Sequence, residues 1–349
     1  MAECSRIPDI DVGALFGGSP EDMQRVDSQI EHAAFVAGFM TVHGFPKQLP
    51  VGKHRRNLLL QLFELPMSAQ RPLWKRNFAP ENAHIYRGWW PLESGPQRNR
   101  EGVDIGPDIF RATAERFSDD LLCEATPLPD ASAVPPRWHA TLVNYYQGME
   151  TLGFALLDSL SRSLNIDPEI FRGAFDDGIS TLRLLRYPAR RPCDLAADAE
   201  PDRYAMIDGE RRELSARAHV DSGLLTILSP CEVRGLQAEG SDGSWHDVPA
   251  DEDRLAVNFG GLMEYWTGGR IRATRHRVVS QEIERRSIPF FFEPRPDTRI
   301  EPLPLPSIEP FEPFLYGDHL WATTTKFPEN YGLLHLRPHR AAYRAPMNL

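Results

Sequence analysis

Cysteine is scarce in this 349-residue chain, and its four copies form no pair with metal-binding or redox spacing. Cys4, Cys123, Cys193 and Cys231 stand far apart, with no CxxC motif among them. A disulfide-stapled scaffold and a thiolate zinc site are therefore disfavoured, and a reducing compartment is expected.

Long apolar runs and an excess of basic charge are also missing. No run of about 18 apolar residues occurs, so we expect no membrane span. The first residues lack the basic and apolar regions of a signal peptide, so we expect a cytoplasmic protein. Acidic residues outnumber basic ones by 49 to 39, and the resulting net charge of −10 makes nucleic acid a poor partner.

Helix signals concentrate in the first half of the chain. Apolar spacing predicts a helix over residues 20–39, capped by Ser19, and a second helix over 53–64. The clearest helix, about 30 residues long, ends near Leu164, because apolar residues recur there every three or four positions. Residues 66–134 show no such period and are expected to be irregular.

Short strands dominate the second half. Between Ser180 and Glu293 the candidate segments are separated by turn residues, and Ser241–Ser244 has the composition of a hairpin turn. The candidates are STLRLLRYP, LTILSP, GLQAEG, SWHDVP, RLAVNFG, ATRHRVVS and SIPFFFEP. This pattern predicts an antiparallel sandwich or jelly roll wrapped by helices, followed by a Pro-rich tail with a short helix over 318–327.

A histidine and a carboxylate lie two residues apart in SARAHVDSGLL. On a strand, His219 and Asp221 would project to the same face. Alone, this spacing favours a simple hydrogen-bonded His–Asp pair over a metal site. His276, in another candidate strand, adds a second imidazole, and two histidines with one carboxylate form the open triad that suits Fe(II) and oxygen chemistry. A closed zinc site would want a fourth ligand.

Arg285 and Ser287 share a face of the next candidate strand. The guanidinium fork can bind a carboxylate through two parallel hydrogen bonds, and the serine hydroxyl adds another donor. Alone, Arg-x-Ser favours an arginine on a surface strand.

Other candidate groups favour less specific roles. His335 and His339 are expected in a solvated tail, and His246-Asp247 in an exposed hairpin. The irregular segment contains two tryptophans and two arginines that could have either of two roles: Trp89, Trp90, Arg98 and Arg100. These side chains either line the mouth of a substrate site or cover the core.

Taken in order, these motifs resemble the Fe(II)/2-oxoglutarate-dependent dioxygenases of the isopenicillin N synthase-like superfamily. The resemblance runs from about residue 7 to 327 and rests on IPDIDV, AAFVAGFMTVHGFP, LFELP, YRGWWPLESG, HVDSGLLTIL, GLQAEGSDGSWHDVP, LAVNFGGLMEYWTGGRIRATRHRVV and RRSIPFFFEP. It implies a mainly β fold with flanking helices. A double-stranded β-helix (jelly roll) catalytic core would cover 177–295, a helical and irregular N-terminal region 1–176 and a tail 296–349, all in one structural unit.

The resemblance also assigns roles. It implies that His219, Asp221 and His276 bind Fe(II), that Arg285 and Ser287 hold the distal carboxylate of 2-oxoglutarate, and that Tyr187 supports the same cosubstrate. Three positions depart from the family pattern without removing any of these residues: Leu185 for Asn, Gly261 for Asp in NxGD, and Arg275 for Pro. We expect Arg275 to face solvent.

The implied activity is oxidation, most often hydroxylation, of a C–H bond in a small-molecule substrate, with O2 consumed and succinate and CO2 released. Desaturation and ring closure stay open, as do the substrate and the oligomeric state. Three alternatives remain: an isopenicillin N synthase-like oxidase that uses no 2-oxoglutarate, a non-catalytic jelly-roll binding protein, and a metal-dependent hydrolase on the same triad.

Overall fold

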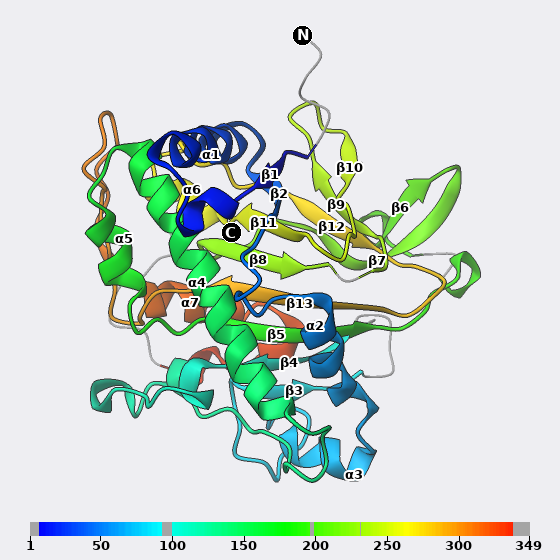
Figure 1. Ribbon diagram of the computed structural model, residues 1–349. Helices are drawn as coiled ribbons and strands as arrows, with labels where there is room; N and C mark the ends of the chain where they lie inside the picture. Colours follow the sequence, from blue (N-terminus) through cyan, green and yellow to red (C-terminus); the bar gives the residue numbers. More distant parts are fainter. Residues whose placement is uncertain (1–6, 93–99, 196–198, 231, 338–349) are drawn as a thin grey trace.

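Two curved sheets form the centre of the molecule (Figure 1). The computed structural model describes residues 7–92, 100–195, 199–230 and 232–337. The strands of the larger sheet are β1 (Asp9–Asp11), β2 (Phe39–His43), β3 (Gly88–Trp90), β4 (Glu101–Ile105), β5 (Thr181–Tyr187), β8 (Leu225–Ser229), β11 (Leu255–Phe259) and β13 (Arg285–Phe292). They follow the order β1-β2-β11-β8-β13-β5-β4-β3.

The smaller sheet has the strand order β10-β9-β12-β7-β6. Its strands are β6 (Tyr204–Ile207), β7 (Glu210–His219), β9 (Leu236–Glu239), β10 (Trp245–Asp247) and β12 (His276–Val279). Neighbouring strands of this sheet are antiparallel. Two further strands, β14 (Arg299–Ile300) and β15 (Phe314–Leu315), form a separate antiparallel pair. The two sheets are the walls of a jelly roll, as the sequence predicts.

The helices flank the sheets. They are α1 (Pro20–His32), α2 (Lys53–Leu60), α3 (Met67–Gln70), α4 (Trp138–Leu164), α5 (Pro168–Phe175), α6 (Gly261–Trp266) and α7 (Tyr316–Thr324). Helix α4 packs on β8 and β13, while α1, α2 and α5 pack on α4. In the described residues, no helix combines the length and apolar character needed to cross a bilayer.

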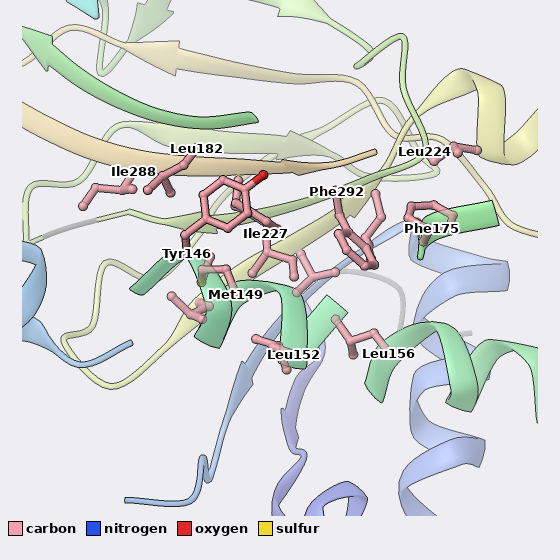
Figure 2. Packing of buried hydrophobic residues seen from close by; sticks show 14 of the residues in the cluster. Tyr146, Met149, Leu152, Leu156, Phe175, Leu182, Leu224, Ile227, Ile288 and Phe292 are labelled. Atoms are coloured by element: carbon pink, nitrogen blue, oxygen red, sulfur yellow. The ribbon is translucent and has the colours of Figure 1, made fainter. Parts of the chain in front are cut away.

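Helix α4 supplies the main hydrophobic contact with the larger sheet (Figure 2). Its apolar residues recur every three or four positions, so they form one stripe along the helix. Tyr146, Met149, Leu152 and Leu156 on this stripe are all fully buried. They belong to the same cluster as residues from the facing strands: Leu182, Ile227, Ile288 and Phe292.

The first helix is shorter than its apolar spacing suggests. The hydroxyl of Ser19 accepts a hydrogen bond from the backbone N–H of Asp22 at 3.1 Å, which confirms the expected cap. Helix α1 ends at His32 and continues as a π-helical turn to Ala37. Gly38 then adopts φ +62°, and a Cβ there would lie 2.3 Å from the carbonyl oxygen of Arg272. The chain can therefore turn into β2 only with glycine at this position.

The expectation of an irregular segment over 66–134 is wrong in part. Strands β3 and β4 lie within it and extend the larger sheet beyond β5. They span only three and five residues, which is too short for an alternating pattern to emerge. The sequence patterns also miss the β6–β7 hairpin, the β14–β15 pair and helices α3, α5 and α6. They do predict β5, the strands from β8 to β13 and the helix near 318.

The packing of α4 generates a stability prediction. We expect Leu156→Ala to lower the free energy of unfolding by about 2–5 kcal/mol, because the fully buried side chain leaves a cavity against the sheet. Urea denaturation would measure the change. Met67→Ala is the control, since Met67 is 59% exposed and should change stability by less than about 0.5 kcal/mol. Equal effects of the two substitutions would contradict this account of the core.

Candidate metal centre and carboxylate site

Three side chains with metal-binding atoms converge at one end of the smaller sheet. His219 ends β7 and His276 begins β12, and antiparallel pairing sets the two residues opposite each other. Their ring centroids are 4.3 Å apart. The Oδ1 atom of Asp221 lies 3.6 Å from the Nε2 atom of each histidine. The candidate ligand atoms all lie within 4.8 Å of one another, so one ion could contact all three.

One detail of the predicted geometry differs. The sequence pattern places His219 and Asp221 on one strand, but β7 ends at His219 and Asp221 lies in the loop that follows. The backbone N–H of Gly261 holds this loop by donating to the carbonyl oxygen of Asp221 at 2.7 Å. Asp221 therefore reaches the histidines because of loop contacts rather than strand alternation.

The hydrogen bonds of the histidines leave the inward nitrogens free to bind a metal. Nδ1 of His219 lies 2.7 Å from the carbonyl oxygen of Arg217, and Nδ1 of His276 lies 3.3 Å from that of Thr274. A carbonyl can only accept, so Nδ1 carries the proton and Nε2 keeps its lone pair. Burial, together with the neighbouring His219, lowers the pKa of His276 to about 4, which keeps it neutral.

Asp221 is held by one carboxylate oxygen while the other faces the histidines. Its Oδ2 atom accepts hydrogen bonds from the hydroxyl of Thr226 at 2.7 Å and the amide of Asn258 at 2.8 Å. Burial alone would raise the pKa of Asp221, but the imidazoles of His276 and His219 and the Asn258 amide hold it well below its ordinary value. The carboxylate is therefore charged and oriented, as a metal ligand must be.

A second group of candidate residues lies on β13 and β5. Arg285 and Ser287 are both buried, and Arg285 pairs with Tyr187 across the two strands. The guanidinium stacks over the Tyr187 ring, 5.0 Å from its centroid. Its Nε atom donates to the carbonyl oxygen of Val233 at 3.3 Å.

The arrangement around Arg285 fits an anionic ligand. Within the described part of the chain, its Nη1 atom and the hydroxyl of Ser287 are buried without a hydrogen-bond partner, and no carboxylate forms an ion pair with Arg285. A buried cation that lacks a counter-charge is costly, and so is a buried donor that lacks an acceptor. A ligand carboxylate would satisfy both residues.

A cavity with about 740 Å³ of empty space opens beside the three candidate metal ligands and contains His219 and Asp221 in its wall. Part of its lining is apolar: Leu224, Leu225, Phe291, Phe292, Leu320 and Phe327. The rest includes charged side chains: Arg100, Arg183, Glu293 and Glu329. The space can therefore accept a small molecule with both apolar and polar parts.

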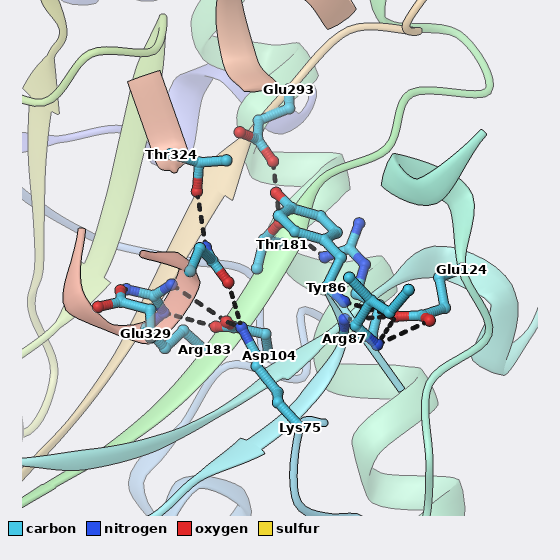
Figure 3. Close-up of polar contacts among 12 residues, drawn as sticks. Lys75, Tyr86, Arg87, Asp104, Glu124, Thr181, Arg183, Glu293, Thr324 and Glu329 are labelled. Carbon is cyan, nitrogen blue, oxygen red and sulfur yellow. Dashed lines mark hydrogen bonds and ion pairs between the residues drawn. The ribbon is translucent and has the colours of Figure 1, made fainter. Parts of the chain in front are cut away.

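Ion pairs link the polar wall of this cavity to the C-terminal segment (Figure 3). Arg183 contacts Asp104 at 2.5 Å and Glu329 at 2.9 Å. Fully buried Lys75 donates to Asp104 at 2.7 Å and to Asn330 at 3.0 Å. Burial alone would raise the pKa of Asp104, but Arg183 and Lys75 hold it well below its ordinary value. This cluster fixes Arg183 in place.

Several other expectations can be compared with the structure. Arg275 is half-exposed and pairs with Glu239 at 3.1 Å, away from the candidate metal ligands. Arg100 lines the cavity, whereas Trp89 and Trp90 are buried. The described candidates His335 and His246 do not belong to a metal-binding group. His339 and Arg98 lie outside the described residues.

Sequence reasoning missed residues that support or surround the site. Thr226 and Asn258 stand in LTIL and NFGG, but nothing in these motifs indicates that both hydrogen-bond Asp221. Glu293 stands near the end of the motif RRSIPFFFEP that contains Arg285, and strand alternation from Ser287 could have placed it on the same face.

Comparisons with known proteins agree with this geometry. A family model of the 2OG-Fe(II) oxygenase superfamily matches residues 180–294. Isopenicillin N synthase of Streptomyces clavuligerus is 28% identical over 332 residues, covering 90% of this chain and 94% of the relative. A 2-oxoglutarate-dependent dioxygenase of Penicillium crustosum is 28% identical over 311 residues, covering 82% of this chain and 84% of the relative.

A solved structure shares the fold. A Neurospora crassa protein, crystallised in complex with alpha-KG and thymine, superposes with a TM-score of 0.72 at 23% identity. The match covers 92% of this chain and 96% of the Neurospora chain. The likeness therefore extends over the N-terminal helices as well as the two sheets.

The geometry of the three candidate ligands generates a metal-binding prediction. We expect Asp221→Ala to weaken Fe(II) binding by more than about 10–100-fold, because it removes the only carboxylate of the three. Anaerobic titration followed by metal analysis would measure this. Asp247→Ala, at an exposed position of β10, is the matched control. Unchanged Fe(II) affinity in Asp221→Ala would contradict the assignment.

Proposed function

Because the chain belongs to the 2OG-Fe(II) oxygenase superfamily, we propose that His219, Asp221 and His276 hold its Fe(II) and that Arg285 and Ser287 bind the distal carboxylate of 2-oxoglutarate. The protein is an Fe(II)- and 2-oxoglutarate-dependent oxygenase. The observation that carries the cosubstrate assignment is the buried Arg285 guanidinium: among the residues that the structure describes, neither its Nη1 atom nor the hydroxyl of Ser287 has a hydrogen-bond partner.

Fe(II), 2-oxoglutarate and O2 together supply the oxidising chemistry, in which 2-oxoglutarate yields succinate and CO2 and a substrate C–H bond is oxidised. The charges of the proposed assembly cancel. Two positive charges on the metal and one on Arg285 offset one negative charge on Asp221 and two on the cosubstrate. Balanced charge lowers the cost of burying such a site.

The residues of the chain orient these components. The Nδ1 hydrogen bonds of His219 and His276 fix the imidazole planes, and Thr226 and Asn258 fix Asp221. Tyr187 supports the cosubstrate through its ring, which packs on the Arg285 guanidinium. The cavity would hold a small-molecule substrate with a C–H bond near the metal, and most often that bond would be hydroxylated.

A second candidate is an oxidase that uses no 2-oxoglutarate, because isopenicillin N synthases are among the relatives. The two functions differ in one measurable product. Formation of succinate from 2-oxoglutarate, dependent on Fe(II) and O2, supports the proposed cosubstrate. Oxygen consumption without succinate formation would support the oxidase.

The cosubstrate role of Arg285 generates a kinetic prediction. We expect Arg285→Ala to raise the KM for 2-oxoglutarate by at least about 30-fold, because a buried, charge-assisted pair contributes about 2 kcal/mol or more. Succinate formation at varied 2-oxoglutarate concentrations would measure KM. Arg275→Ala removes a half-exposed arginine and should leave KM unchanged. An unchanged KM in Arg285→Ala would refute the role.

A further inference from the structure

Glu293 is a buried carboxyl in the wall of the cavity that also contains His219 and Asp221. It follows the last residue of β13 and is 5% exposed. It is not one of the proposed metal ligands and does not belong to the Arg285–Ser287 pair. Its place in the cavity therefore calls for a separate explanation.

The contacts of Glu293 anchor it without neutralising it. Its Oε2 atom accepts from the hydroxyl of Thr181 at 2.9 Å, and its Oε1 atom from the hydroxyl of Tyr316 at 3.0 Å. Thr181 in turn accepts from Arg87 at 2.7 Å, so this cation reaches Glu293 only through the threonine (Figure 3). A carboxylate oxygen can accept about two hydrogen bonds, so each oxygen retains capacity for another donor.

Other buried acids in the same region differ from Glu293. Asp104 and Glu329 both form direct ion pairs with Arg183. In the described ranges, no lysine, arginine or histidine lies within 4.0 Å of the Glu293 carboxyl. Burial raises the pKa of Glu293 to about 7, although Arg87 and the two hydroxyl donors oppose this shift. The structure thus keeps an incompletely compensated acceptor beside the proposed reaction site.

We propose that Glu293 is a specificity-determining residue that accepts a hydrogen bond from an N–H or O–H group of an uncharged substrate. This inference rests on the proposed function, since it assigns the substrate class of the same site. The substrate class follows from charge. The charge of Asp221 is already offset in the proposed metal and cosubstrate assembly. With Glu293 ionised, the other charged residues of the cavity wall balance as well: Glu293, Glu329, Arg100 and Arg183. A neutral ligand preserves that balance, whereas a charged one disturbs it.

The experiment compares matched probes on the full chain loaded with Fe(II) and 2-oxoglutarate under nitrogen. Benzamide carries an N–H donor, and N,N-dimethylbenzamide keeps the ring and carbonyl but lacks the donor. Ligand-observed NMR titration gives the ratio of their Kd values. Glu293→Met has no carboxylate, so in this variant the ratio reports only the difference in size between the two probes. Dividing the wild-type ratio by the Glu293→Met ratio therefore isolates the contribution of the hydrogen bond.

We expect the preference for benzamide over N,N-dimethylbenzamide, measured as the ratio of their Kd values, to be at least about tenfold larger in the wild-type protein than in Glu293→Met. A difference of this size is typical of a hydrogen bond to a charged group. Glu293→Gln keeps an acceptor oxygen and should give an intermediate ratio, which also tests the proposal if the methionine variant fails to fold. Glu309→Gln, at an exposed position, should match the wild type.

Three results would overturn the proposal. The first is a probe ratio that is the same in wild type and in the Glu293 variants. The second is binding of both probes weaker than about 10 mM. The third is tighter binding of the cation benzamidine than of benzamide. The binding measurement needs no turnover, so its failure can be separated from failure of the proposed function. If succinate forms normally but one of these three results is found, the role of Glu293 alone is rejected. If the protein discriminates between the two probes as expected but forms no succinate, the proposed function alone is rejected.

Discussion

The register between β7 and β12 places His219 directly opposite His276, and the proposed metal centre depends on that pairing. A shift of one residue would turn one imidazole to the other face of the sheet. Asp221 has no strand partner and needs a different restraint. The end of β11 and the start of α6 provide it, because Gly261 donates to the Asp221 carbonyl oxygen and the Asn258 side chain donates to its carboxylate. A Cβ on Gly260 would lie 2.7 Å from the same carbonyl oxygen, so the turn between β11 and α6 approaches closely only with glycine there.

Arg183 and Arg285 differ in whether the protein supplies their counter-charge. Arg183 contacts two carboxylates, Asp104 and Glu329, and is therefore satisfied by the fold itself. Arg285 has an aromatic ring and a carbonyl oxygen as neighbours, but no carboxylate within the described residues. The first arrangement stabilises the closed structure, whereas the second leaves a charge for a ligand to neutralise. Counter-charge thus distinguishes Arg183 from the proposed ligand-binding Arg285.

Much of this architecture follows from local sequence patterns. The apolar stripe of α4 fixes which face of that helix is buried. The two-residue repeat of a strand sets Arg285 and Ser287 on one face of β13, so their shared face could be assigned from sequence alone. Strands β3 and β4 could not be found this way, because they are short strands stabilised by pairing rather than by their own pattern: β4 pairs with β5, and β3 pairs with β4. The orientation of Asp221 likewise depends on loop contacts that no local motif encodes.

The cavity wall shows why a site can be recognised before its ligand is. Its metal side comes from β7 and the loop after it, whereas its polar side combines residues that lie far apart in the chain. The Lys75–Asn330 contact spans 255 positions and the Arg183–Glu329 contact spans 146. These contacts fix the C-terminal segment against the larger sheet, and Leu320 and Phe327 from that segment complete the wall. The proposed metal ligands and the Arg285–Ser287 pair therefore lie within the jelly roll, whereas part of the cavity wall comes from the C-terminal segment that packs upon it.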